Sequence, residues 1–312
     1  MKYVLGVDSG GTKYLVRAAA LDGRLIGCDE GPAANHYMQP YDEVVGLINA
    51  AIDRCIAQFG GSRAECAYIL TGSTGCDSDE DQQLLTRLYE GLEGFSCPVH
   101  CVNDAELAHY TATGGVGLLL IAGTGSIAFG RNAAGAARRV GGWPLSVMGE
   151  EGSGRYVDAW AMHEYTRYLD GVRERTPLME QIERATGVRT AKEMMDYGMQ
   201  MFGPPWPTPR LGAAVGEAAL AGDPSACMIL DRAAAWNYDL PHELAGVLGF
   251  AREDAFTIGL WGSTIVKGQY QQAALKRLLG EAYPHARVVI AEIDAAQGAV
   301  QWALERLKGA AV

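Results

Sequence analysis

An acid, a glycine pair and a hydroxyl-cation pair stand close together near the start of the chain: Asp8, Gly10, Gly11, Thr12 and Lys13. An apolar run precedes them, which predicts that the acid ends a buried strand. Glycines let a backbone approach a ligand closely, and their N–H groups can form an anion-binding concavity. A strand-end carboxylate suits a hydrated Mg²⁺ ion. The segment therefore fits a phosphate and magnesium site, and equally a plain hairpin with a Gly-Gly turn.

Two more glycine- and hydroxyl-rich turns follow apolar runs later in the chain. The first comprises Gly123, Thr124, Gly125 and Ser126. Its N–H groups and two hydroxyls could bind the β- and γ-phosphates of a nucleotide, with a simple hairpin turn as the structural alternative. The second turn contains Gly259, Gly262, Ser263 and Thr264.

A polar pair, Asn103 and Asp104, follows the strand predicted over residues 98–102. A carboxylate at the end of a strand can accept a proton from a hydroxyl that lies within hydrogen-bond reach. Asp104 is therefore a candidate general base for transfer to a hydroxyl. The same residue could instead cap a helix that starts at Ala105.

Three further segments could contact a polar substrate. Asn35 and His36 lie in a predicted loop, where an Asn is also typical of a turn. Glu150 and Glu151 precede a predicted helix start, which acids stabilise whatever their function. Gly142 and Trp143 come shortly before them.

These residues are positioned by an α/β pattern that occurs twice. We expect a strand at 3–8, a second strand that begins at Tyr14, and strands at 24–28, 66–70 and 98–102, with helices at 41–58 and 79–92. The pattern restarts with strands at 116–122, 127–131 and 138–140, followed by strands at 255–260 and 287–290 and a last helix at 295–307. Each half opens as strand, glycine-rich hydroxyl turn and strand, which an internal duplication explains.

The predicted domains are residues 1–114 and 115–293, and the helix at 294–308 is expected to pack back on the first. The second domain carries a helical insertion at about 152–250, interrupted by a proline-rich loop at 202–209. Pro241 should kink or restart the last of its helices. The fold class is α/β, with two mixed sheets flanked by helices.

The length and net charge of the chain exclude some classes of function. The chain has 312 residues and a formal net charge of −11, which argues against nucleic acid or an anionic membrane as its main partner. No apolar run reaches the roughly 18 residues of a membrane span. The seven cysteines are odd in number and contain no C-x-x-C, and no signal peptide is apparent, so we expect a reduced, cytoplasmic protein.

Taken in order, Gly6 to Lys13, Asn103-Asp104-Ala105 and Ile121 to Ser126 resemble the phosphate-1, catalytic-carboxylate and phosphate-2 motifs of the actin-like ATPases, the superfamily of sugar kinases, Hsp70 and actin. Residues 141–154 are similar to the G-G-W-G…G-D-E-G-S segment of N-acetylglucosamine kinases and BadF/BcrA-type ATPases. Asn35 and His36 lie where those kinases have an Asn-His sugar loop. The resemblance spans nearly the whole chain.

The resemblance implies two actin-like (ribonuclease H-like) domains with a central cleft for ATP and Mg²⁺. Asp8 would hold Mg²⁺ through water, Asp104 would be the base, and Gly259, Gly262, Ser263 and Thr264 would form the adenosine motif. The implied substrate is an amino sugar, most simply N-acetylglucosamine phosphorylated on its 6-hydroxyl. Its contacts would come from Asn35, His36, Asn103, Gly142, Trp143, Glu150 and Glu151. A homodimer is also implied.

Two positions depart from the family pattern, and both belong to the implied sugar pocket. Pro144 stands where a Gly is usual, and Glu150 stands where an Asp is usual. Two alternatives stay open: an activator ATPase of the 2-hydroxyacyl-CoA dehydratase or benzoyl-CoA reductase kind, and a sugar or ATP sensor without turnover. The activator ATPase alternative lacks support, because no cysteine pair follows the phosphate-2 turn and the next cysteine is Cys227.

Overall fold

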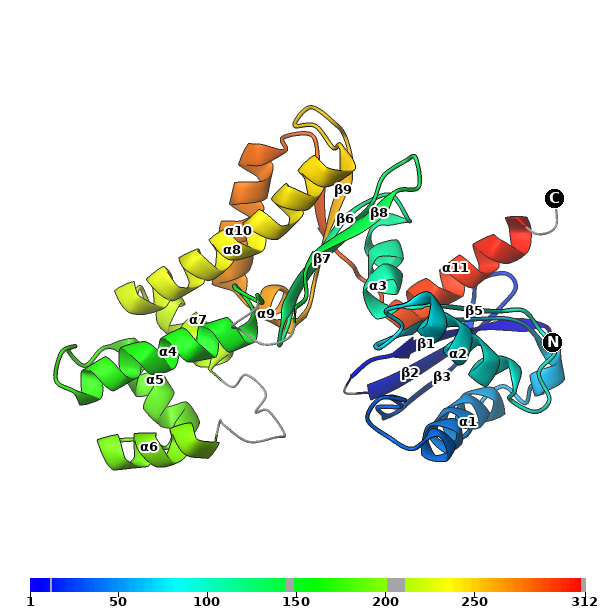
Figure 1. Ribbon diagram of the computed structural model, residues 1–312, viewed down its shortest axis with the longest axis horizontal. Coiled ribbons are helices and arrows are strands. Elements are labelled where there is room, and N and C mark those ends of the chain that lie inside the picture. Colours follow the sequence, from blue (N-terminus) through cyan, green and yellow to red (C-terminus); the bar gives the residue numbers. More distant parts are fainter. Residues whose placement is uncertain (12, 144–148, 201–210, 310–312) are drawn as a thin grey trace. The chain divides into compact units, whose positions relative to one another are not determined.

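The computed structural model describes residues 1–11, 13–143, 149–200 and 211–309. The chain divides into two compact units, Met1–Gly115 with Ala291–Val312 and Val116–Ile290. We call them the first and second units. Each contains a five-stranded mixed sheet, as the sequence predicts (Figure 1). The strand orders are β3-β2-β1-β4-β5 and, read from the matching edge, β8-β7-β6-β9-β10. The two sheets therefore share one topology, which agrees with an internal duplication.

In the first sheet, β1 pairs antiparallel with β2 and parallel with β4, and β4 pairs parallel with β5. Antiparallel β3 continues to Pro32, four residues beyond its predicted end. The strands of this unit are β1 (Tyr3–Ser9), β2 (Lys13–Ala20), β3 (Leu25–Pro32), β4 (Cys66–Ser73) and β5 (Val99–Asn103). Its helices are α1 (Tyr41–Ala57), η1 (Arg63–Glu65), α2 (Asp79–Glu90), α3 (Asp104–Thr113) and α11 (Ala295–Gly309).

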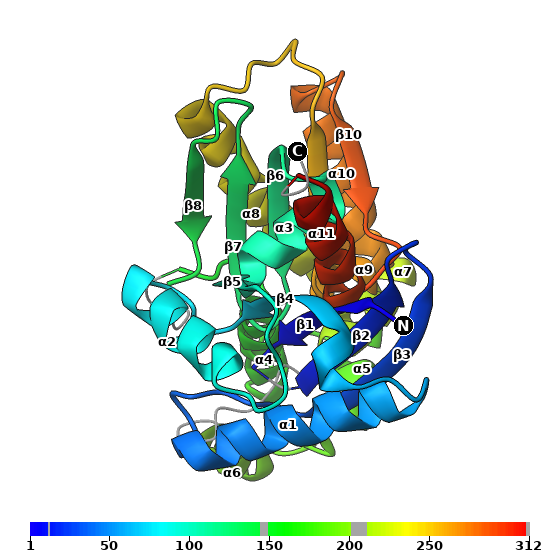
Figure 2. The same cartoon turned by 90° about the vertical axis from the view of Figure 1, so that its right-hand side faces the viewer.

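Helices cover both faces of the first sheet, with α1 and α11 on opposite sides (Figures 1 and 2). Alternation along β1 explains this: Tyr3, Leu5 and Val7 are buried in one core with residues of α1 and α2. The other face carries Gly6, where a Cβ would lie 2.2 Å from the Ala296 carbonyl oxygen. The missing side chain therefore lets α11 approach the sheet backbone directly.

The second sheet repeats the arrangement with β6 (Gly117–Ala122), β7 (Ser126–Arg131), β8 (Ala137–Gly141), β9 (Thr257–Trp261) and β10 (Arg287–Ile290). Its helices are α8 (Pro224–Leu248), α9 (Ser263–Val266) and α10 (Gln269–Ala282). Leu244, Leu275 and Leu279 are buried against strand residues in its core. Helix α8 runs past the buried Pro241 without restarting there, contrary to one of our two expectations.

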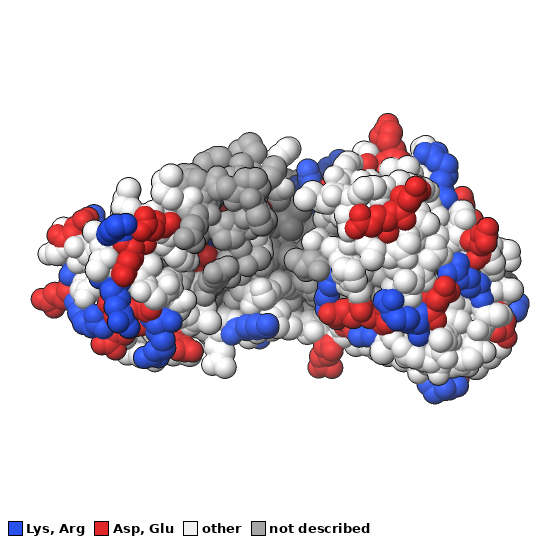
Figure 3. Space-filling view, turned by 90° about the horizontal axis from the view of Figure 1, so that it is seen from below, with Lys and Arg blue, Asp and Glu red and all other residues white. Residues whose placement is uncertain are grey.

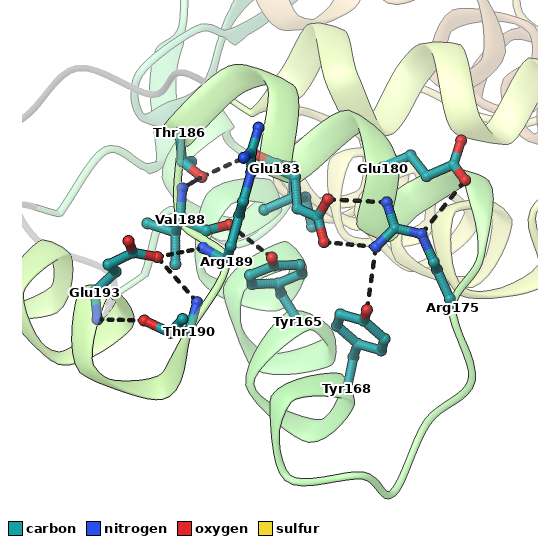
Figure 4. Close-up of polar contacts among 11 residues, drawn as sticks. Tyr165, Tyr168, Arg175, Glu180, Glu183, Thr186, Val188, Arg189, Thr190 and Glu193 are labelled. Atoms are coloured by element: carbon teal, nitrogen blue, oxygen red, sulfur yellow. Dashed lines mark hydrogen bonds and ion pairs between the residues drawn. The ribbon is translucent and has the colours of Figure 1, made fainter.

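Between β8 and α8, the described residues form the helices α4 (Gly154–Leu169), α5 (Pro177–Thr186), α6 (Ala191–Gln200) and α7 (Gly212–Leu220). They share a separate apolar core that includes Tyr165 and Ile182. Polar contacts join the turns around it (Figure 4). Arg175 donates both terminal nitrogens to Glu183 at 2.8 and 2.9 Å, and the Tyr165 hydroxyl donates to the Val188 carbonyl at 2.7 Å. The proline-rich loop predicted at 202–209 lies outside the described residues.

We expect Gly6→Ala to destabilise the chain, because the added methyl group would also lie 2.5 Å from the Val300 backbone nitrogen. Overpacking of this kind costs about 1–3 kcal/mol. Urea unfolding should show that loss. The matched control is Gly46→Ala in α1, where a Cβ meets nothing within 4 Å and better helix propensity should stabilise by up to ~1 kcal/mol. Equal stability of the two variants would contradict the close contact between β1 and α11.

Candidate active site

In the first unit, the carboxyl ends of β1, β4 and β5 lie side by side. Parallel pairing places Asp8 opposite Gly72 and Ser73 opposite Asn103. Strand ends from three separate parts of the sequence thereby meet at one edge of the sheet. This edge carries the Asp8 and Asp104 side chains that the motifs predict for the site.

The turn from β1 to β2 is a hairpin in which the Gly10 N–H donates to the Lys13 carbonyl at 3.0 Å. A Cβ at Gly11 would meet nothing within 4 Å, so the turn leaves open space at that residue. The Lys13 ammonium pairs with Glu30 at 3.1 Å, and both side chains are exposed. The lysine charge is thus shared with a neighbouring acid. Thr12, predicted to bind phosphate, lies outside the described residues.

Asp8 is a carboxyl group with a strongly perturbed pKa. Its pKa is raised from the ordinary 3.8 to about 6, chiefly by burial and also by the Asp104 and Asp294 carboxylates, while Lys13 opposes the shift. The Asp104 and Asp294 carboxylates near Asp8 form a region of negative potential. A divalent cation would relieve that repulsion, so Asp8 fits the expected magnesium position.

Asp104 is the first residue of α3, and burial raises the pKa of its carboxyl group. The Thr74 hydroxyl donates to Asp104 Oδ2 at 2.6 Å, and this bond works against the upward shift. Our motif analysis assigned no role to Thr74. The signal was present, since Thr74 directly follows the hydroxyl-rich end of β4, but the contact became visible only when β4 and β5 were paired.

The cap of α3 is Asn103, whose side-chain oxygen accepts from the Ala105 N–H at 2.9 Å. Its amide nitrogen donates to Asp77 at 3.0 Å. Asp104 therefore lies inside the helix, and the capping role that we considered for it belongs mainly to its neighbour. Both polar ends of the Asn103 side chain are used within the unit.

The loop with Asn35 and His36 lies against the segment that carries Thr74. A Cβ at Gly75 would lie 2.8 Å from the Tyr37 ring and 3.3 Å from the His36 ring. Asn35 Oδ1 accepts from the Tyr37 N–H at 2.9 Å, which closes a turn. His36 Nε2 is buried and has no hydrogen-bond partner among the described residues. A ligand hydroxyl could satisfy that nitrogen.

In the second unit, the turn at 123–126 is fastened to two other elements. The Gly154 N–H, at the start of α4, donates to the Gly123 carbonyl at 2.8 Å, and the Thr264 hydroxyl donates to the same oxygen at 2.9 Å. Ser126 Oγ donates to the Glu151 carbonyl at 2.9 Å. The structure thus brings the predicted phosphate-2 turn together with Glu151 and Thr264.

Glu150 packs on this turn in a strained conformation. Its φ of +69° is the only left-handed value at a non-glycine among the described residues. A Cβ at Gly125 would lie 2.0 Å from Glu150 Oε1. Burial raises the pKa of the Glu150 carboxyl group, and Arg155, 3.6 Å away, opposes the shift. The resemblance implies a sugar contact for Glu150, and the structure places this residue beside the turn at 123–126.

The preceding segment also reaches the turn. Gly142 donates its N–H to the Ser126 carbonyl at 2.9 Å and has a φ of +71° that favours glycine. Trp143 is exposed, with the Arg139 guanidinium 5.4 Å from its ring centre. Pro144, one of the two departures from the family pattern, lies outside the described residues.

A cavity of about 490 Å³ opens beside α4, α7, α9 and α10 in the second unit. Its size suits a small ligand. Ser263 and Thr264, two residues of the predicted adenosine motif, line it, whereas Gly259 lies within β9 in the sheet. Gly262, with a φ of +92°, brings the end of β9 against Ala122, since a Cβ there would lie 2.4 Å from that carbonyl oxygen. The lining also includes Gly154, Gly212, Glu217, Lys267, Tyr270 and Gln271.

Acidic and basic side chains are interspersed over both units on the face drawn in Figure 3. No three His, Cys, Asp or Glu side chains in the described ranges gather as a metal site. Within that same part of the chain, no helix has the length and apolarity that crossing a bilayer requires.

This chain belongs to the BadF/BadG/BcrA/BcrD ATPase family, whose pattern it matches over residues 5–303. It is 28% identical over 305 residues to the N-acetylmuramic acid/N-acetylglucosamine kinase of Clostridium acetobutylicum, covering 96% of this chain and 97% of that one. It is 26% identical over 315 residues to the N-acetyl-D-glucosamine kinase of Dictyostelium discoideum, covering 97% and 98%.

The fold is shared with a protein from Chromobacterium violaceum that has been assigned as an N-acetylglucosamine kinase. The two superpose with a TM-score of 0.76 at 24% identity, covering 96% of this chain and 98% of the other. The expected family and the actin-like fold class are thereby confirmed, and the matching relatives are sugar kinases.

The raised pKa of Asp8 predicts a specific pH dependence of stability. Between about pH 4 and 6 the folded chain keeps a proton on Asp8 that the unfolded chain releases, because burial favours the neutral acid. The stabilising contribution is complete below pH 4 and is lost as the pH rises through 6. In EDTA, Asp8→Asn should therefore raise the melting temperature relative to the parent at pH 7 more than at pH 4.

Taking the difference between parent and variant cancels the other titrating groups. Mg²⁺ should then stabilise the parent at pH 7 and leave the Asp8→Asn variant nearly unchanged. A melting-temperature difference that stayed flat from pH 4 to 7 would contradict the perturbed pKa.

Proposed function

We propose that this chain is an ATP-dependent kinase that transfers the γ-phosphoryl group to the 6-hydroxyl of an amino sugar, with N-acetylglucosamine as the acceptor. The observation that carries the proposal is the half-buried Asp104 carboxylate, oriented by Thr74 at the end of adjacent parallel strands. Family membership supports the use of ATP. The names of both sequence relatives support an amino-sugar acceptor.

Asp104 is suited to act as the general base. Burial raises its pKa, and a carboxylate with a higher pKa is a stronger proton acceptor for a sugar hydroxyl. The Thr74 hydroxyl occupies one position on Oδ2 and holds the carboxylate in one orientation. Lone pairs on both oxygens remain for the acceptor hydroxyl, since each carboxylate oxygen can accept more than one hydrogen bond.

The second unit offers the groups for the nucleotide. We place the adenosine in the cavity lined by Ser263, Thr264 and Tyr270, and the phosphates at the turn of residues 123–126. Phosphoryl transfer needs positioning and charge neutralisation more than covalent chemistry from the protein. Asp8 would hold Mg²⁺ through water, and the ion would neutralise charge on the phosphates.

The sugar would draw on the loop of Asn35 and His36. The buried His36 Nε2 without a partner is the clearest polar atom available for a sugar hydroxyl. The family resemblance adds Trp143 and Glu151 as further contacts. It also supports a homodimer in the cytoplasm.

We expect Asp104→Asn to lower the rate of sugar phosphorylation by about 10²–10⁴-fold, because an amide cannot accept the proton. The assay couples ADP release to Mg-ATP with N-acetylglucosamine, glucosamine, N-acetylmuramic acid, glucose or no sugar. Binding of ATP, measured by calorimetry, should stay within about twofold. Asp196→Asn, at an exposed position in α6, is the control. A variant with near-parental turnover would remove Asp104 from the mechanism, and sugar-independent ADP release would favour an activator ATPase.

Thr74→Val should lower kcat by about tenfold through loss of one hydrogen bond to a charged group. That bond lowers the pKa of Asp104, so its removal should move the acidic limb of the pH profile of kcat/KM toward higher pH. Thr74→Ser keeps the hydroxyl and should restore the parental limb. A slower Thr74→Val enzyme with an unmoved pH profile would mean that Thr74 supports the fold only.

A further inference from the structure

The position of Arg155 is unfavourable for helix stability, which suggests that the residue has a functional role. It lies in the first turn of α4, which begins at Gly154 after the Ser153 cap. The first turn of a helix carries the positive end of the helix dipole, so a cation there is destabilising and an acid would be preferred. No acid occupies this first turn. The position therefore calls for an explanation other than helix stability.

Within the described part of the chain, the one partner of the Arg155 side chain is Glu150, and the pair is loose. The closest nitrogen-oxygen distance is 3.6 Å, too long for a hydrogen bond, and Glu150 Oε2 is buried with no hydrogen-bond partner among the residues that the structure describes. The Arg155 side chain is 29% exposed, against 13% for Glu150. The N–H donors of the guanidinium therefore remain available to another acceptor. The Glu150 carboxylate holds the guanidinium nearby.

The backbone ties Arg155 to the phosphate-2 turn. Its N–H approaches the Thr124 carbonyl at 3.4 Å, beside the 2.8 Å bond from Gly154 to Gly123. Gly154 also lines the cavity assigned to the adenosine. The Arg155 backbone therefore belongs to the short segment that connects that cavity to the turn at 123–126.

A polyphosphate on this acidic chain needs a cation of its own. The net charge is −11, and Lys13, the lysine of the phosphate-1 motif, pairs with Glu30 at 3.1 Å. An arginine binds phosphate oxygens through two parallel N–H donors, which a lysine cannot do. None of the motifs in the sequence assigns such a residue.

We propose that Arg155 binds the terminal phosphate oxygens of the nucleotide and that Glu150 positions its guanidinium for this contact. The identity of the nucleotide rests on the proposed function, whereas the role of the cation rests on the contacts of the second unit. Nucleotide binding would exchange the loose pair with Glu150 for charge-assisted hydrogen bonds to phosphate. Glu150 then acts on the phosphates through Arg155.

Binding measurements test this without any sugar. Calorimetry with the non-hydrolysable analogue AMPPNP, in the presence of Mg²⁺, should show about tenfold weaker binding to Arg155→Met than to the parent. Adenosine, which has no phosphate, should bind both within about twofold. Arg155→Lys should recover part of the affinity because it keeps the charge. Arg184→Met, at an exposed position in α5, is the matched control and should bind both ligands as the parent does.

A structural alternative is that Arg155 only neutralises the buried Glu150 carboxylate. Removing the arginine would then disturb the turn by leaving that charge unpaired, and Arg155→Met combined with Glu150→Gln would restore AMPPNP affinity. Our proposal expects the double variant to refold as stably as the parent and still bind AMPPNP about tenfold more weakly. Restored affinity in the double variant, or equal loss of AMPPNP and adenosine binding, would overturn it.

Kinetics separate this inference from the proposed function. If the parent phosphorylates a sugar, Arg155→Met should lower kcat/KM for ATP and leave KM for the sugar within about threefold. If no sugar is phosphorylated, the kinase proposal fails, and the comparison of AMPPNP with adenosine still decides the role of Arg155. A parent that bound adenosine and AMPPNP equally well would contradict the inference directly.

Discussion

Parallel pairing of β1, β4 and β5 is the constraint on which the first half of the site depends. Parallel neighbours end at the same edge of a sheet, so three separate sequence segments deliver Asp8, Thr74 and Asp104 to one place. The same edge concentrates negative charge in a partly buried setting. Burial first and the neighbouring carboxylates second raise the pKa of Asp8, and together they create a position where a cation would be stabilised.

The second unit repeats the sheet topology, but different contacts hold the ends of its strands. Its turn at 123–126 is held from one side by the start of α4 and from the other by Thr264, so both partners meet on the Gly123 carbonyl. Two buried amides, Asn237 and Gln271, also donate to the Gly152 carbonyl at 3.0 and 3.1 Å. These bonds connect α8 and α10 to the loop with Glu150. The strained Glu150 backbone is therefore maintained by hydrogen bonds from elements far away in the sequence.

The motifs and the α/β alternation were sufficient to predict the fold class, the family and the location of most strands. They succeeded because a glycine-rich turn after a buried strand, or an acid at a strand end, is a local property of the chain. They did less well for individual contacts. They did not reveal that Asn103, a predicted sugar contact, also caps α3, or that the long α8 continues through Pro241 because its buried face packs on the sheet.

What the sequence by itself determined was which residue types stand at the ends of which strands, and from this the actin-like architecture. Only the tertiary structure decided how those residues are used. Lys13 is paired because β3 brings Glu30 beside it, Asp104 is oriented because β4 brings Thr74, and Glu150 is placed next to Arg155 and Gly125 by the fold of residues 149–155. Each pairing joins side chains through strand register or loop geometry. A pattern read along one segment carries no information about the partner that a distant segment supplies.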